Sequence, residues 1–395
     1  MKKPQLLARF RHRTAALFLA GHLLASCTYA TGSTEENPDP ATVQSVQAHK
    51  KIKIALLLDT SNSMDGLIEQ AKSQLWTLVN ELSKAHNGDT KPDLQIALYE
   101  YGNDRLNAME GYIRLVTPLT SDLDKVSGDL FSLTTNGGSE FCGHVIQTSL
   151  NQLDWKATGE DLQVIFIAGN EEFTQGAVNY KKACLAARDK KVVVNTIYCG
   201  QFNQGVNEMW KDGAELANGT YMSIEQDRKT VYIDSPYDKE ILQLNNKLND
   251  TYIQYGSQGQ AKKANQIRQD ANAESLAPAN SVQRAVSKTK HFYKAEEWDL
   301  VDAKKEGKVD LKKVDKATLP AELKSMSEPE MEKYVETKSK EREEVKAKIG
   351  ELNQKREAYV KEQQSKQTKG NGKMLDDAMI KSIRTQAKEK GMSFE

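Results

Sequence analysis

An acid and two hydroxyls stand at alternate positions directly after an apolar run in KIALLLDTSNSMDGL, residues 53–67. They are Asp59, Ser61 and Ser63, and alternate side chains of a tight loop can converge on one point. Mg²⁺ takes such oxygen ligands in an octahedron and keeps several waters. Ser and Asp are also ordinary helix N-caps, so the pattern needs support from other loops before it indicates a cation site.

Two later loops offer further oxygens. In LTTNGGSEFCG, residues 133–143, two glycines precede Ser139 and allow a turn that brings a third hydroxyl toward the first loop. Asn170 follows the apolar run LQVIFIAG and adds an amide oxygen.

The segments that position these loops alternate between strand and helix patterns. Apolar runs predict strands at 51–59, 94–102, 111–119, 162–170, 191–200 and 220–226. Helical spacing predicts helices at 67–82, 122–133, 144–155, 178–190 and 205–218. This alternation predicts an α/β fold, with a doubly wound, mostly parallel sheet like that of Rossmann folds. Ligands bind such sheets outside the carboxyl ends of the strands, where these loops should lie.

The order of these features resembles a von Willebrand factor type A (vWA) domain: a strand, the motif D-x-S-x-S-M, the motif G-G-[TS], and a further strand that ends in a polar loop. The resemblance implies a metal-ion-dependent adhesion site (MIDAS) with Asp59, Ser61 and Ser63 as ligands. Ser139 stands where the family usually has Thr and keeps the hydroxyl. The cofactor implied is Mg²⁺, with Mn²⁺ and Ca²⁺ as alternatives.

The chain departs from the family at the last motif. Where Thr-Asp-Gly is usual, it has Ala168, Gly169 and Asn170, so the second carboxylate is missing and Asn170 is the remaining ligand there. One carboxylate leaves the cation less neutralised, which predicts weak affinity and favours an acidic group from a protein partner. Glu171 or Glu172 would compensate through water, and an Asp at position 169 should strengthen binding. A vestigial site without metal is the alternative.

The N-terminal residues predict secretion and a lipid anchor. Residues 1–26 have a basic start and a short apolar stretch, the layout of a secretory signal peptide. Leu24, Ala25 and Ser26 before Cys27 resemble a bacterial lipobox, which predicts lipidation of Cys27 and a place in the cell envelope. No Asp follows Cys27, and in lipoproteins of this type that points to the outer membrane. Residues 27–50 read as a flexible tether.

Three cysteines remain after Cys27 in an oxidising compartment, so one disulfide is expected. Cys142 and Cys199 both fall near the ligand-binding edge, whereas Cys184 lies well down its helix. The pairing predicted is Cys142 with Cys199, and three buried thiols are the alternative.

The C-terminal part differs in kind. We expect the vWA domain at 51–235, a helical extension at 236–330, and a long charged helix with a loose tail at 331–395. The seam along 331–359 is only partly apolar, which favours a solvated helix or a hairpin on the domain over a coiled coil.

Composition and motifs limit the functions. Loss of residues 1–26 would leave 50 basic against 55 acidic side chains, which argues against a general nucleic-acid binder. No G-x-S-x-G, P-loop or H-E-x-x-H motif occurs, so we expect no enzyme. The sequence predicts a lipoprotein that binds another protein, the alternative being an envelope assembly protein that acts through its C-terminal helices with an idle metal site.

Overall fold

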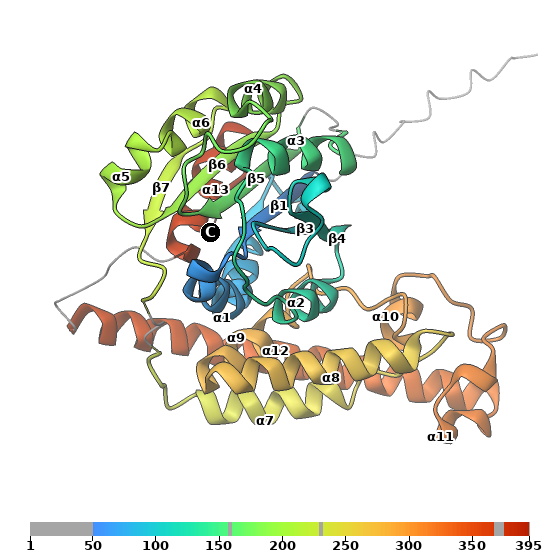
Figure 1. Ribbon diagram of the computed structural model, residues 1–395. Helices are drawn as coiled ribbons and strands as arrows, with labels where there is room; N and C mark the ends of the chain where they lie inside the picture. Colours follow the sequence, from blue (N-terminus) through green and yellow to red (C-terminus); the bar gives the residue numbers. More distant parts are fainter. Residues whose placement is uncertain (1–49, 157–159, 229–231, 367–374, 395) are drawn as a thin grey trace, which may run out of the picture. The chain divides into compact units, whose positions relative to one another are not determined.

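The computed structural model describes residues 50–156, 160–228, 232–366 and 375–394 (Figure 1). The predicted signal peptide, the lipidation site at Cys27 and residues 28–49 of the tether lie outside the described residues.

Six strands form the central sheet in the order β4-β3-β1-β5-β6-β7 (Figure 1). All neighbours are parallel except the edge strand β4, which is antiparallel to β3. The strands are β1 (Lys51–Asp59), β3 (Asp93–Tyr101), β4 (Ile113–Thr120), β5 (Leu162–Gly169), β6 (Val193–Cys199) and β7 (Tyr221–Ile224). β1 and β5 are buried on both faces, which explains their continuous apolar sequences. The predicted doubly wound, mostly parallel sheet is confirmed.

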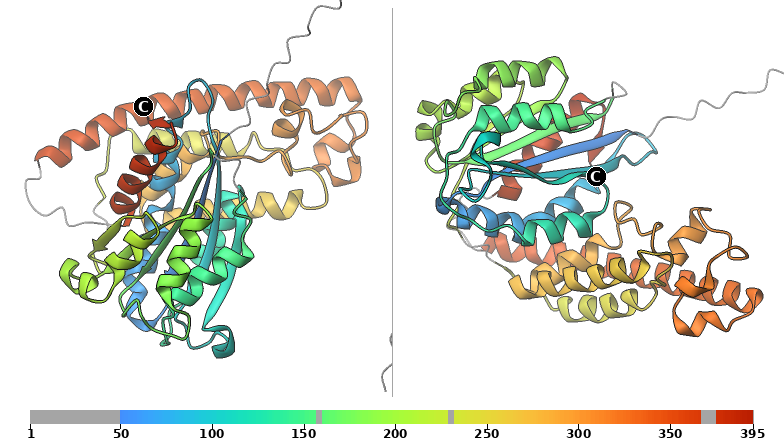
Figure 2. Two further views of the ribbon diagram at one scale, coloured as in Figure 1. Left: turned by 90° about the horizontal axis from the view of Figure 1, so that it is seen from above. Right: turned by 45° about the vertical axis from the view of Figure 1, so that its right-hand side comes forward.

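Helices cover both faces of the sheet (Figure 2). One face packs on α1 (Asp65–Leu82), α2 (Leu123–Phe131) and α13 (Leu375–Glu389). The other packs on α3 (Cys142–Gln152), α4 (Tyr180–Asp189) and α6 (Trp210–Leu216). The single helix expected at 205–218 is instead α5 (Phe202–Asn207) and α6, because Met209 between them takes a left-handed φ of 68°.

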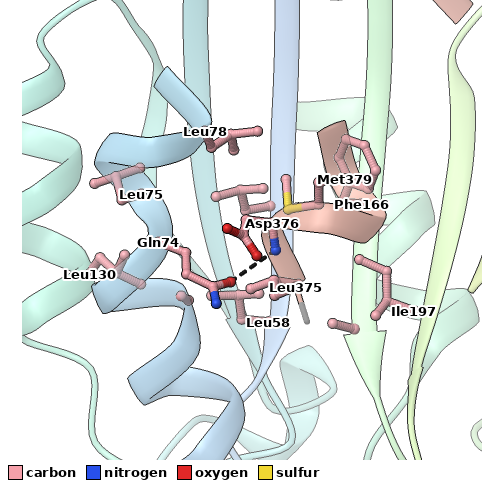
Figure 3. Close-up of a pocket in the computed structure, with 13 residues that line it drawn as sticks. Leu58, Gln74, Leu75, Leu78, Leu130, Phe166, Ile197, Leu375, Asp376 and Met379 are labelled. Carbon is pink, nitrogen blue, oxygen red and sulfur yellow. Dashed lines mark hydrogen bonds between the residues drawn. The ribbon is translucent and has the colours of Figure 1, made fainter. Parts of the chain in front are cut away.

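The predicted loose tail is wrong for residues 375–394. α13 is an amphipathic helix whose apolar side chains, Leu375, Met379 and Ile383 among them, are buried in the core against α1 and the sheet. Leu375 and Met379 line a small cavity together with Phe166 and Ile197 (Figure 3). Its volume is about 20 Å³, room for about one water molecule. The helical spacing of apolar residues at 375–387 indicates this helix in the sequence. The prediction missed it because the polar segment KQTKGNGK precedes it.

Polar contacts fix the position of α13 on the sheet. Asn195 of β6 is fully buried, and its Oδ1 accepts from Gln386 Nε2 at 2.7 Å and from Ser382 Oγ at 3.0 Å. Beyond the helix, β8 (Ser393–Phe394) pairs with β2 (Ala85–His86) in a separate two-stranded sheet. The core of the strand-and-helix domain is therefore completed from a segment that follows the whole helical extension.

The helical extension packs beneath α1 and α2. It comprises α7 (Asp238–Asn249), α8 (Gly259–Leu276), α9 (Pro278–Ser287), α10 (Leu300–Lys305), α11 (Ala321–Lys324) and α12 (Glu328–Lys366). Asn80 Nδ2 on α1 donates to the Gln283 carbonyl on α9 at 2.9 Å. α12 contacts α7 and α10 through a narrow stripe of buried residues, so it is a single charged helix laid on the others.

Two buried arginines hold the extension together and to the sheet domain. Arg284 on α9 is fully buried, with Nη1 2.7 Å from Asp124 Oδ1 on α2 and Nε 3.0 Å from Asp270 Oδ1 on α8. Arg342 on α12 is 1% exposed and pairs with Asp299 at 2.6 Å. Buried charges persist only when they are paired, so both arginines depend on these partners.

The predicted Cys142–Cys199 disulfide is wrong. Cys142, Cys184 and Cys199 are all free and buried. Cys142 begins α3 and packs in the core on one face of the sheet, whereas Cys199 ends β6 and packs in the core on the opposite face. Both lie near the carboxyl edge, as expected, but the sheet separates them.

Candidate metal site

The main chain brings the loops of the candidate site together at the carboxyl edge of the sheet. The Thr60 N–H donates to the Tyr101 carbonyl at 2.8 Å, which ties the loop after β1 to the end of β3. The Asn136 N–H donates to the Thr60 carbonyl at 3.0 Å and draws in the loop between α2 and α3.

Four of the five predicted ligands lie in one hydrogen-bonded cluster. Asp59 is fully buried, and its Oδ1 accepts from the Ser61 N–H at 2.7 Å. The Ser61 and Ser63 Oγ atoms are 3.2 Å apart, and Ser63 Oγ donates to Asn170 Oδ1 at 3.3 Å. Asp59 Oδ2 is buried without a hydrogen-bond partner. A buried carboxylate oxygen costs free energy unless something compensates it, so this atom points to a missing ligand.

Ser139 lies in the same group of loops but is not hydrogen-bonded to this cluster. Among the described residues no hydrogen bond joins it to Asp59, Ser61 or Ser63. Its loop is held by the Asp104 N–H, which donates to the Gly137 carbonyl at 2.6 Å. A Cβ atom on Gly138 would lie 2.1 Å from the Gly102 carbonyl oxygen, so the second glycine is needed for this close approach.

Glu140 is a site residue that the sequence reasoning missed. It is 4% exposed, and its Oε2 is buried without a hydrogen-bond partner. A Cβ atom on Gly102 would lie 2.7 Å from Glu140 Cγ and 2.8 Å from Asp59 Oδ1, so the two acids flank the same small space. The sequence does contain a sign of this residue, because Glu140 directly follows the Gly-Gly-Ser motif that predicted a site loop.

The two carboxyl groups disturb each other's protonation. Burial, and then the charge of Glu140, raise the pKa of Asp59 well above its usual range. Burial likewise raises the pKa of Glu140, and the charge of nearby Glu171 adds to this effect. Like charges brought together in a dry site favour a bound proton or a bound cation between them.

Tyr101 fills the space where the family usually has its second acid. A Cβ atom on Gly169 would lie 2.5 Å from the Tyr101 Oη and 3.1 Å from Asp59 Oδ2. The Tyr101 hydroxyl donates to the Ala168 carbonyl at 3.0 Å and is fixed there. Even an Ala side chain at position 169 would collide with Tyr101, so an Asp there could strengthen metal binding only if the ring moved.

The donors present suit a hard divalent cation. No three His, Cys, Asp or Glu side chains gather as metal ligands within the described ranges, so two acids would need hydroxyl oxygens and water to complete the shell. Asp59 and Glu140 each offer an unpartnered oxygen, and Ser61 and Ser63 lie beside them. Carboxylate, hydroxyl and water oxygens are the ligands of Mg²⁺ rather than of softer metals.

Comparison with known protein families gives one match. The family model for the von Willebrand factor type A domain matches residues 53–232. None of the curated proteins compared with the chain matches it.

Several solved structures are similar to part of the chain. BatB from Bacteroides thetaiotaomicron, described as a conserved hypothetical protein, is 18% identical over 44% of this chain and 90% of its own, with a TM-score of 0.35. An aerotolerance-related membrane protein from Bacteroides fragilis is 15% identical over 45% of this chain and 93% of its own, with a TM-score of 0.31. Proximal thread matrix protein 1 from the mussel byssus, with a zinc-occupied MIDAS motif, is 14% identical over 46% of this chain and 43% of its own, with a TM-score of 0.33.

The sheet order, the position of the D-x-S-x-S loop and the family match point the same way. Residues 53–232 of this chain are a von Willebrand factor type A domain.

Proposed function

We propose that this chain is a non-enzymatic lipoprotein of the bacterial envelope whose vWA domain binds another protein around a divalent cation. vWA domains generally mediate protein–protein interaction. The observation that carries the proposal is the pair of buried, unpartnered oxygens, Asp59 Oδ2 and Glu140 Oε2, at the carboxyl edge of the sheet.

Asp59, Ser61 and Ser63 would hold the cation, with Ser139 and Asn170 at its margin. Glu140 supplies the second carboxylate that position 169 lacks. Mg²⁺ fits this small set of hard oxygens and its retained waters, and Mn²⁺ and Ca²⁺ use the same kinds of donor. Two acids rather than one raise the expected affinity above the sequence prediction, because they neutralise the charge of the cation.

A lipid anchor at Cys27 would hold the protein at the outer membrane. Among the described helices, none is long and apolar enough to cross a bilayer. If Cys27 carries lipid, the wild-type protein should fractionate with membranes and Cys27→Ser should be released or remain uncleaved. A processed Cys27→Ser protein that stays with the membrane would remove this part of the proposal.

Thermal unfolding with and without cation tests the metal site. A cation that binds only the folded state should raise the temperature of the unfolding midpoint. At a cation concentration ten times the dissociation constant, the free energy of unfolding should rise by about 1.4 kcal/mol. Asp59→Ala should abolish that gain while the apolar strand β1 remains in place. If Mg²⁺, Mn²⁺ and Ca²⁺ all leave the wild-type midpoint unmoved, the cluster is a set of turns and caps.

Partner capture separates this proposal from the assembly alternative. Capture through the vWA site should fall with a chelator and with Asp59→Ala, whereas assembly through the helical extension should be indifferent to both. Deletion of residues 291–395 is not a usable test, because it removes α13 from the core of the vWA domain. Charge reversals on the exposed face of α12 leave α13 intact and serve instead.

A further inference from the structure

Acidic side chains gather on the loops at the carboxyl edge of the sheet. We call this surface the carboxyl edge, made of loops 60–65, 102–112, 132–141, 170–179, 200–209 and 225–228, of which 200–209 contains the short helix α5. Its exposed acids are Asp65, Asp104, Glu110, Glu171, Glu172, Glu225 and Asp227. The six loops contain no Lys, although the whole chain has 55 basic and 55 acidic residues. The acidity of this edge is therefore a local separation of charge.

Few cations offset these acids. Arg105 is exposed on the edge, and Arg228 lies half-buried 3.7 Å from Glu225. Arg114, just beyond the edge on β4, pairs at 2.5 Å with the buried Glu100. An uncompensated acidic surface attracts positively charged groups and repels acidic ones.

Exposed apolar side chains lie on the same edge. Four large hydrophobic side chains are exposed in the described part of the chain, and three of them, Met109, Phe202 and Met209, belong to these loops. Met109 is 92% exposed at the tip of the loop between β3 and β4. Met209 is held outward by a left-handed backbone, which costs a non-glycine residue about 1 kcal/mol. Exposed apolar groups within a polar rim mark surfaces that bind proteins.

A hollow of about 870 Å³ opens beside Phe202. Its lining combines that aromatic ring with the acids Glu225 and Asp227 and with Arg228, next to the ends of β6 and β7. Arg228 is paired with Glu225, so Asp227 is the acid that remains for an incoming cation. The Phe202 and Tyr221 rings pack at 4.8 Å between centroids, which gives the hollow one apolar wall. Such a recess fits a long side chain with an apolar stem and a cationic head, as in Lys or Arg.

The cation site gives no reason to prefer an acidic partner. A single carboxylate at the metal would have favoured an acidic group from the partner. Asp59 and Glu140 flank the same space, so the two carboxylates would match both positive charges of a divalent cation bound there. An incoming acid would then meet the surrounding glutamates and aspartates without a net positive centre to attract it.

We propose that the carboxyl edge binds a segment of a partner protein that carries Lys or Arg beside apolar side chains. The inference rests on the proposed function only in taking this edge as the binding surface. It specifies the chemistry of the partner, because the acids select the cationic groups and Met109, Phe202 and Met209 supply apolar contacts.

Fluorescence anisotropy with three labelled peptides in Mg²⁺ buffer tests the proposal. The probes are GKFKLKFKG, its acidic counterpart GEFELEFEG, and GKSKSKSKG, which keeps the charge but lacks the apolar groups. The first should bind, the second should not, and the third should bind at least fivefold more weakly than the first. Binding should weaken as salt is raised from 50 to 300 mM, because the exposed charges are screened.

Matched variants locate the binding surface. The triple variant Glu171→Gln, Glu172→Gln, Asp227→Asn should weaken binding of the first peptide at least fivefold. The control triple removes three exposed acids of the helical extension, Glu306→Gln, Glu322→Gln and Glu344→Gln, and should bind like the wild type. Phe202→Ser should weaken binding without changing the salt dependence. Equal loss in both triples, or preference for the acidic peptide, would overturn the proposal.

The two proposals fail separately. If Mg²⁺ raises the unfolding midpoint but the basic peptide does not bind the edge, the partner chemistry is wrong and the metal site stands. If the basic peptide binds the edge but no cation moves the midpoint, the docking surface stands and the metal site fails.

Discussion

Glu140 is the second carboxylate of the candidate metal site. Its carboxyl group shares a small buried space with Asp59. Burial raises the pKa of both acids, and the charge of Glu140 raises that of Asp59 further. A divalent cation removes this cost, whereas a neutral side chain at position 140 would leave the cation with one carboxylate.

We therefore expect Glu140→Gln to weaken Mg²⁺ binding by at least fivefold. The same substitution should raise the stability of the cation-free protein at neutral pH, because it removes a buried like-charge contact. Calorimetric titration and thermal unfolding measure the two effects. Glu306→Gln, which changes an exposed acid of the helical extension, is the control and should change neither. Wild-type Mg²⁺ affinity in Glu140→Gln would show that this acid is not a ligand.

Gly169 and Tyr101 provide a second prediction. Gly169→Ala should destabilise the fold by about 1–3 kcal/mol, because its Cβ would lie 2.5 Å from the Tyr101 Oη. Tyr101→Phe alone should cost about 1 kcal/mol through the lost hydrogen bond to Ala168. In the double variant the collision is gone, so denaturant unfolding should show less destabilisation than the two single changes added together. Additive losses would mean that the close contact is not the cause.

The sequence revealed part of this site and not the rest. Asp59, Ser61 and Ser63 are neighbours along the chain, so their spacing, together with the resemblance to vWA domains, predicted that they converge. Glu140 and Tyr101 reach the site from other loops and strands, and their importance depends on packing distances of a few ångströms. No local pattern records that the ring of Tyr101 fills the space beside Gly169.

Among the helices and strands, α13 is the element that the local sequence pattern failed to place in the core. The alternation of apolar runs predicted each strand of the sheet and its parallel arrangement, because a buried strand must be apolar on both faces. α13 has an equally clear apolar face, but a polar segment and the long charged α12 separate it from the rest of the domain. The disulfide prediction failed for a related reason, since it used position along the strands and not the face of the sheet.

Asp376 at the start of α13 makes the docking of this helix sensitive to pH. Burial raises its pKa to about 6, with a smaller effect from the charge of Asp377. The neutral carboxyl is thus the form that folding favours. Its contribution to stability is complete below the unfolded pKa of about 4 and is lost as the pH rises through about 6.

Asp376→Asn should therefore stabilise the protein at pH 8 by roughly 1–2 kcal/mol and leave its stability at pH 4 nearly unchanged. Denaturant unfolding between pH 4 and 8 measures this difference. The neighbouring Asp377 is exposed, so Asp377→Asn should produce only a small change. Equal effects of the two substitutions at pH 8 would contradict the assignment to burial.

For the whole molecule, Arg284 joins the helical extension to the vWA domain. Its guanidinium is fully buried between Asp124 on α2 and Asp270 on α8, and it lies 4.5 Å from the centre of the Trp76 ring on α1. Both acids and the ring come from different helices, so this one side chain bridges the two parts of the structure.

Asp124→Asn should cost about 3–5 kcal/mol of unfolding free energy, because it leaves part of a buried charge without its partner. The loss should appear in a single cooperative transition, since Arg284 and α13 link both parts. Asp129→Asn, a half-buried acid on the same helix, should cost about 1 kcal/mol or less. Two separate transitions, only one of them moved by Asp124→Asn, would show that the extension unfolds independently.

The late position of α13 in the chain has a consequence for biogenesis. A polypeptide emerges from its amino end, so β1, β5 and β6 are all made before the helix that covers one of their faces. Until residues 375–394 arrive, apolar residues such as Phe166 and Ile197 remain uncovered and open to association with other nascent chains. If the signal peptide proposed above directs export, the chain would reach the membrane before its core has closed. A chain that stops before residue 375 should therefore leave this apolar face of the sheet exposed.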